Sequence, residues 1–150
     1  MRLRLHWCLK SADSQYSRCN METTSITLSG IEYHLRFEQD DVIACENELR
    51  MGYTNFFRVE DHRPISLSLI LCRTLIHHGL KTKTKRGELE YVFVQTSAGA
   101  SGAGSLIQEH LLTGGSLIEI WEKCFDAFVQ GWFGKPKTDK TKKDEEPSKN

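Results

Sequence analysis

The sequence predicts an α+β domain in which an N-terminal β-hairpin packs on a small bundle of about four helices. Residues 26–37 (ITLSGIEYHLRF) alternate apolar and polar side chains across a Ser-Gly pair. Later segments instead repeat their apolar residues every three or four positions, as helices do. Residues 135–150 contain no aromatic or aliphatic residue, so we expect them to form a disordered, charged C-terminal tail.

Composition restricts the class of protein. The chain has 150 residues, of which 39% are hydrophobic and 27% are charged, as in one ordinary soluble domain. Its formal net charge is zero, which argues against a dedicated nucleic-acid binder. No segment approaches the roughly 18 apolar residues that predict a membrane span. The five cysteines are scattered without a CxxC pair, so we expect reduced thiols and a cytoplasmic protein.

The expected domain boundaries follow from pattern. Residues 1–20 show no clean period and are interpreted as a disordered or upstream extension, residues 21–134 as the domain, and residues 135–150 as the tail. An alternative for the first segment is an N-terminal strand over residues 2–9, with Leu3, Leu5 and Trp7 on one face.

The first predicted elements are the hairpin and a short helix. Ile26 and Leu28 share one hairpin face, as do Tyr33, Leu35 and Phe37 after the turn. Residues 40–52 then place Val42, Cys45 and Leu49 at helical spacing. Asp40 or Asp41 is the expected N-terminal cap of this helix, and Gly52 its end.

A second helix is expected from Pro64, a residue that the first helical turn tolerates, to Gly79. Ile65, Leu69, Cys72 and Ile76 form its main apolar stripe. Because further leucines and isoleucines widen that stripe, we expect a central helix that is covered on more than one side.

The next part of the chain is less regular. The basic run of residues 81–86 (Lys81, Lys83, Lys85 and Arg86) is expected to be a solvated loop. Periodicity does not separate strand from helix over residues 88–95, where strand is favoured. The Ala, Gly and Ser residues of positions 97–105 predict a flexible linker.

Two helices are expected at the end of the domain, separated by Gly114 and Gly115. Ser116 is the expected cap of the second one. Apolar residues at three- and four-residue steps give this last helix a bulky ridge: Leu117, Ile120, Trp121, Cys124, Phe125 and Phe128, ending in Trp132 and Phe133.

No residues predict catalysis, a metal or a cofactor. His77 and His78 are adjacent, so on a helix they point about 100° apart, and we expect them to interact with the helix C-terminus instead. Gly99, Gly102 and Gly104 lack the lysine of a triphosphate-binding loop. We therefore expect a protein that is not an enzyme.

The order of these features resembles the tail assembly chaperones of long-tailed, siphovirus-like bacteriophages and gene transfer agents, over about residues 24–134. The hairpin matches the family pattern L-x-G-x-E-Y-x-L-R-F at seven positions: Leu28, Gly30, Glu32, Tyr33, Leu35, Arg36 and Phe37. Cys45, Glu46 and Leu49 approximate the core of the family's next helix. Leu75, Gly79, Leu80 and Lys81 match the pattern L-x-x-L-x-x-x-G-L-K, and Leu71 lies one position before its first leucine. The first twenty residues and the long segment of residues 81–104 depart from the family.

The resemblance implies a phage or prophage chaperone that binds and solubilises the tape measure protein and helps to recruit tail tube subunits. It implies a location in the host cell cytoplasm and absence from the mature virion. Self-association is a further expected interaction, whereas nucleic acid and membrane are not expected partners. The candidate partner-binding residues are Ile65, Leu69, Ile76, Trp121, Phe125, Phe128, Trp132 and Phe133, and ordinary core packing is the alternative for each.

Two other classes stay open. One is a small nucleic-acid-associated regulator that uses the basic run of residues 81–86 and the tail. The other is an enzyme built on His77, His78 or Cys124. A longer form made by ribosomal frameshifting, which the resemblance also suggests, would join the domain near Lys135.

Overall fold

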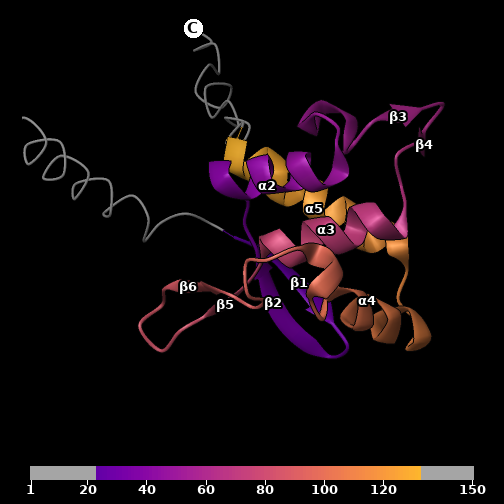
Figure 1. Ribbon diagram of the computed structural model, residues 1–150. Helices are drawn as coiled ribbons and strands as arrows, with labels where there is room; N and C mark the ends of the chain where they lie inside the picture. The colour runs from indigo at the N-terminus through magenta and orange to yellow at the C-terminus, as the bar shows by residue number, and fades with distance from the viewer. Residues whose placement is uncertain (1–22, 133–150) are drawn as a thin grey trace, which may run out of the picture.

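The computed structural model describes residues 23–132 and has the predicted α+β architecture (Figure 1). A four-stranded antiparallel sheet has the strand order β1-β2-β5-β6, and β3 and β4 form a separate small hairpin. The strands are β1 (Thr24–Leu28), β2 (Ile31–Leu35), β3 (Val59–Glu60), β4 (Arg63–Pro64), β5 (Leu80–Lys83) and β6 (Leu89–Tyr91). The helices are α2 (Gln39–Leu49), α3 (Leu69–Gly79), α4 (Ala103–Leu112) and α5 (Leu117–Trp132), with short 3-10 turns η1 (Tyr53–Asn55) and η2 (Ala98–Ala100).

The N-terminal hairpin is confirmed. Ser29 and Gly30 both have positive φ, at 53° and 78°, which is the two-residue turn that fits the twist of a hairpin. This turn pairs Leu28 with Ile31 and fixes the register of both strands. Ile26, Leu28 and Leu35 are buried on one face, so the alternation in the sequence correctly predicts the face that packs on the helices.

Helix α2 begins earlier than expected. Its N-cap is Glu38, whose backbone N–H donates to Oδ2 of Asp41 at 2.9 Å. The prediction of Asp40 or Asp41 as the cap is therefore wrong, because Asp41 lies three residues inside and bonds back to the cap. The helix ends at Leu49, and its C-cap Arg50 adopts the left-handed conformation (φ 52°), so the end comes before the predicted Gly52.

Helix α3 begins later than expected, at Leu69. Ser68 is its N-cap and its Oγ accepts a hydrogen bond from Leu71 N at 3.1 Å. Pro64 instead lies in β4, after a turn in which Asp61 and His62 both have positive φ. The serine cap, which satisfies a free backbone N–H, therefore decides the start of the helix rather than the proline.

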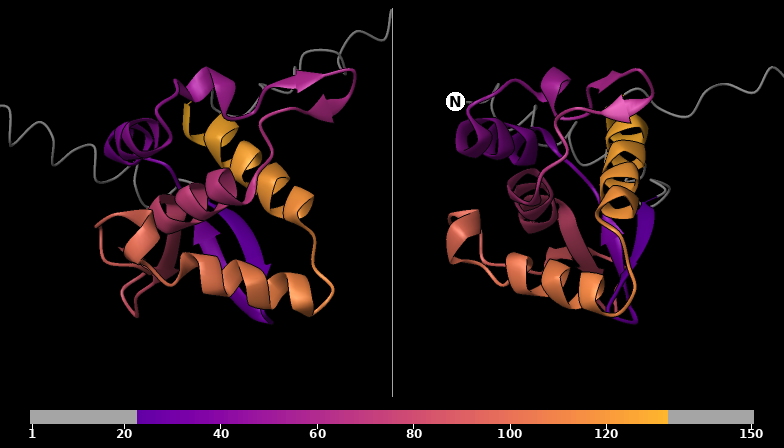
Figure 2. Two further views of the ribbon diagram at one scale, coloured as in Figure 1. Left: turned by 45° about the vertical axis from the view of Figure 1, so that its right-hand side comes forward. Right: turned by 90° about the vertical axis from the view of Figure 1, so that its right-hand side faces the viewer.

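The expected central position of α3 is confirmed. Helices α2, α4 and α5 pack around it (Figure 2), and it supplies much of the core. Leu71, Cys72, Leu75 and Ile76 are all buried. Gly79 ends the helix as predicted, and β5 follows at once.

The segment between α3 and α4 differs most from the predictions. Residues 80–83 form β5, which pairs with β2, so the basic run is not simply a solvated loop. Lys81, the first residue of the basic run, is buried. Only residues 89–91 of the expected strand form β6. The predicted linker is packed: Ala98 and Ala103 are fully buried, because small residues let this segment approach α3 closely.

Helices α4 and α5 agree with the predictions. Gly114, with a φ of 95°, lies in the break between them, and Ser116 Oγ accepts a hydrogen bond from Glu119 N at 3.3 Å at the start of α5. Within residues 23–132, no helix combines the length and apolar character that crossing a bilayer requires. The predictions for residues 1–20, Phe133 and the tail lie outside the described residues.

Candidate functional site

The predicted partner-binding residues divide into a buried and an exposed set. Ile76, Trp121 and Phe128 expose only 0%, 7% and 3% of their surface. They belong to the hydrophobic core, so they are not available to a partner in the folded domain. Helical spacing could not separate them from surface residues, because a wide apolar stripe includes both the centre and the margin of a buried face.

The exposed set consists of Ile65, Leu69 and Phe125, which expose 48%, 59% and 42% of their surface. Val59, on the short hairpin, is also half exposed. We call Val59, Ile65, Leu69 and Phe125 the apolar patch. For the remaining candidates, Trp132 ends α5 and Phe133 lies outside the described residues.

Local contacts tie together the chain segments that carry the apolar patch. Ile65 N donates to Arg58 O at 3.0 Å, and Arg58 directly follows Phe57 in the chain. The ring of Phe57 lies 5.3 Å from that of Phe125, measured between centroids. Ser66 Oγ donates to Asn55 O, which holds the segment that leads into Leu69 and α3.

The base of the apolar patch is an aromatic cluster. The Phe57 ring also lies 5.8 Å from Trp121 and 5.2 Å from Phe128. Trp121 Nε1 donates to Phe56 O at 3.2 Å, which ties the loop before β3 to α5. A partner would therefore meet a surface whose support is fixed by the core, and such rigidity lowers the entropic cost of binding.

Charged residues of the β3–β4 hairpin border the apolar patch. This hairpin stands away from the rest of the domain beside the start of α3 (Figure 1). Arg58 and Glu60 form an exposed ion pair at 2.9 Å, and Asp61 and Arg63 are exposed nearby in the chain. An apolar centre with a polar rim is typical of protein interfaces.

A second candidate is a groove of about 420 Å³ beside α2. Its lining comes from α2, the end of α3 and the chain between β6 and η2: Asp40, Asp41, Ala44, Asn47, Glu48, His78, Tyr91, Gln95, Thr96 and Ser97. Its buried polar groups mostly bond to one another. They form two clusters, one around Asp41 and the other around His78.

The Asp41 cluster contains a buried ion pair. Lys81 Nζ lies 3.1 Å from Asp41 Oδ2 and also donates to the carbonyl oxygens of Arg36 and His78, at 2.6 and 3.1 Å. The Tyr91 hydroxyl donates to Asp41 Oδ1 at 2.5 Å, and its ring lies under the ammonium group. All three protons of the ammonium group have an acceptor, so the cluster joins the residue that follows β2 to α2, α3, β5 and β6.

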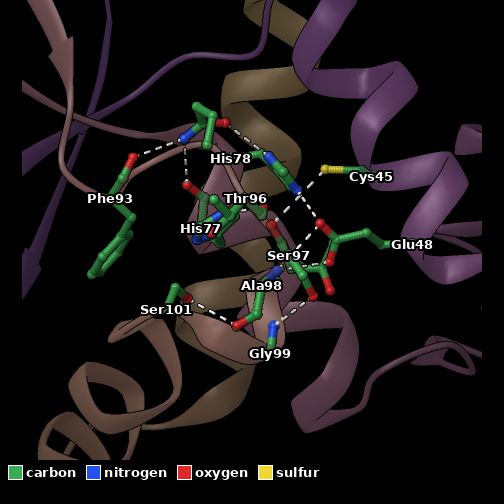
Figure 3. A network of polar contacts seen from close by, with 12 residues as sticks. Cys45, Glu48, His77, His78, Phe93, Thr96, Ser97, Ala98, Gly99 and Ser101 are labelled. Carbon is green, nitrogen blue, oxygen red and sulfur yellow. Dashed lines mark hydrogen bonds and ion pairs between the residues drawn. The ribbon is translucent and has the colours of Figure 1, made fainter.

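The His78 cluster is shown in Figure 3. His78 Nε2 lies 2.8 Å from Glu48 Oε1, and His78 Nδ1 lies 3.0 Å from Gln95 Oε1. His77 Nε2 lies 2.9 Å from Thr96 O, and Glu48 Oε2 accepts from Ala98 N at 3.1 Å. Both histidines are buried. The sequence predicted only that they would interact with the end of α3, and it gave no sign of their burial or of the contacts described above.

Neither cluster offers a reactive nucleophile. Burial, followed by the nearby charge of Asp41, raises the pKa of the Cys45 thiol far above its usual value. Burial also raises the pKa of Cys124. Reactive thiols need the opposite environment, one that stabilises the thiolate. Within residues 23–132 no group of three or more His, Cys, Asp or Glu side chains is arranged to hold a metal ion.

The comparisons with known proteins add no assignment. No protein-family model, curated protein or solved structure matches this chain. The resemblance to tail assembly chaperones therefore stays a prediction from the sequence motifs.

Proposed function

We propose that this protein is a tail assembly chaperone that binds apolar helical segments of a tape measure protein through the apolar patch. The observation that carries this proposal is the position of Phe125, which is 42% exposed and lies beside Phe57 and Trp121. An amphipathic helix presents apolar side chains at three- and four-residue steps, and such a surface suits them.

The physical need for such a partner follows from the tape measure protein itself. A long chain with exposed apolar helices aggregates unless soluble subunits cover it. Many weak contacts along such a chain shield it and still release it later. Recruitment of tail tube subunits is part of the same proposal, and it requires a surface other than the apolar patch.

The nucleic-acid alternative loses support from the burial of Lys81. Its ammonium group is committed to Asp41 and two backbone carbonyl groups, so it is not available to a phosphate. Only Lys83, Lys85 and Arg86 of the basic run remain exposed. We therefore propose no role in nucleic-acid binding.

The test is co-expression with an apolar helical fragment of a tape measure protein from the same phage or prophage. The wild-type protein is expected to keep the fragment soluble and to co-purify with it at high salt. The variant Phe125→Ser with Ile65→Ser is expected to lose most of this effect. The control Ile43→Ser removes an apolar residue of similar exposure, 44%, on α2, and should behave as wild type.

Two results would overturn the proposal. The fragment could stay equally soluble without this protein, or the double variant could protect it as well as wild type does. Circular dichroism of each variant shows whether a loss of binding reflects loss of the fold, which we do not expect at exposed positions.

A further inference from the structure

Residues 92–101 connect β6 to α4 and cross the C-terminal end of α3 (Figure 3). We call this segment the latch. Its Gln95 side chain and Thr96 carbonyl group contact His78 and His77, and its Ala98 N–H donates to Glu48. Val92 and Phe93 pack partly against the core, and Val92 N donates to Leu80 O at 3.2 Å. From Val94 onward only Ala98 is buried, so the polar contacts and the stacking of Phe93 on His77, at 5.8 Å, hold this part in place.

The hydrogen bonds of His77 fix its protonation state. Thr96 O accepts only, so Nε2 of His77 carries the proton that it donates. Nδ1 of the same ring is buried and has no hydrogen-bond partner among the described residues. A second proton on this ring would create a buried donor without an acceptor, which is costly.

The neighbouring ring opposes that second proton as well. His78 has an oxygen on both sides, Glu48 Oε1 and Gln95 Oε1, and the Gln95 amide is oriented by its Nε2 donating to Phe93 O at 3.0 Å. Both ring nitrogens can donate only when the ring is doubly protonated. The two imidazole centroids are 4.5 Å apart, and the electrostatic effect of His78 lowers the pKa of His77.

The surrounding charges relieve this conflict only in part: the charge of Glu48 favours a second proton on His77, but burial outweighs it. Glu48 of α2 faces the pair, but its oxygens already accept from His78 and Ala98. Cys45 of α2 is a neutral thiol that donates to Thr74 O. Arg73 lies one turn before His77 on α3, and the latch itself carries no titratable side chain.

We propose that the latch is acid-sensitive: protonation of His77 releases residues 92–101 from α3 and opens the groove that Gln95, Thr96 and Ser97 line. The direction of the pKa agrees, since burial lowers the pKa of His77 below its usual value, with His78 contributing further. A released latch lets water reach His77, so the open form takes up the proton first as the pH falls.

The test is hydrogen exchange of the full chain at pH 7.5 and pH 5.0, expressed as protection factors so that the intrinsic effect of pH cancels. In the wild type, the protection of Ala98 N–H is expected to fall about tenfold more than that of α3 amides. In His77→Gln, which keeps a donor but cannot titrate, the difference should vanish. The control His62→Asn alters an exposed histidine and should retain the wild-type difference in protection.

The proposal is overturned if the wild-type latch and α3 respond equally to pH, or if His77→Gln responds as wild type does. Should His77→Gln fail to fold, ¹⁵N titration of the wild-type imidazoles decides the question. The Ala98 amide must then shift with the same midpoint as His77, and an Ala98 signal that ignores the titration of His77 overturns the proposal.

Discussion

Lys81 Nζ lies 3.1 Å from Asp41 Oδ2, and both side chains are almost completely buried. Burial lowers the pKa of Lys81, while the charge of Asp41 opposes that shift. The ammonium group also bonds to two backbone carbonyl oxygens, one of them at the end of α3. Each group therefore depends on the other to offset the cost of leaving water.

Lys81→Met is expected to lower the free energy of unfolding by about 3 to 5 kcal/mol, because it leaves the Asp41 carboxylate buried without its cation. Urea denaturation measures the change. The control Lys83→Met alters an exposed lysine two residues along the same strand and should stay within about 0.5 kcal/mol of wild type. A small loss of stability in Lys81→Met would mean that water reaches the Lys81–Asp41 pair.

Gly79→Ala is expected to destabilise the domain by about 1 to 3 kcal/mol through overpacking. A Cβ at position 79 would lie 2.6 Å from Cε1 of Phe37. That ring is confined by Phe128, 5.1 Å away, so the clash outweighs the usual helical preference for alanine. Urea denaturation should show little change in the free energy of unfolding for the control Gly99→Ala, where the nearest atom is 3.6 Å away. Adding Phe37→Leu to Gly79→Ala should restore part of the lost stability.

Trp121→Ala and Phe125→Ala are expected to separate stability from binding. Trp121 is buried and donates to Phe56 O, so its truncation should cost about 3 to 5 kcal/mol. Phe125 is 42% exposed, so its truncation should cost clearly less. Thermal unfolding followed by circular dichroism compares them. Equal losses would place Phe125 in the core and remove the basis for the apolar patch.

The urea midpoint is expected to fall between pH 7.5 and pH 5.0. Burial lowers the pKa of His34 and of His77 from 6.5, so the unfolded chain gains protons first as the pH drops. Their contribution is complete above about pH 6.5 and declines below it. The variant His34→Gln with His77→Gln should flatten this dependence. An unchanged slope in that variant would assign the effect to other groups.

Cys45, Cys72 and Cys124 are expected to be unreactive in the native protein. All three are buried, and burial raises the pKa of Cys72 to about 12. In a variant with Cys8→Ser and Cys19→Ser, a thiol reagent such as DTNB should label these cysteines only as the protein unfolds. Rapid labelling of native protein would show that the core opens locally.

Local patterns predicted the elements that depend on neighbouring residues. Alternation identified the β1–β2 hairpin, and the Gly114–Gly115 break with Ser116 identified the start of α5. The buried role of Lys81 depends on Asp41, forty residues earlier, and no local pattern encodes such a pair. The same holds for His78 and Glu48.

The apolar patch shows the same limit within one helix. Trp121 and Phe125 are one turn apart on α5 and have the same kind of side chain. One is buried because the loop carrying Phe56 and Phe57 covers it, and the other is left at the margin. That loop's position is a tertiary fact, so helical spacing could not assign either residue to the core or to the surface.

The pairing of β2 with β5 joins parts of the chain that are far apart, since Leu35 lies opposite Leu80. The β1–β2 hairpin closes a two-residue turn and can form within microseconds. Because α2 and α3 separate β5 from β2 in the chain, we expect the search for this long-range contact to limit the refolding rate. Mutations at the β2–β5 pair should therefore slow refolding. Mutations in the projecting β3–β4 hairpin should leave the refolding rate nearly unchanged.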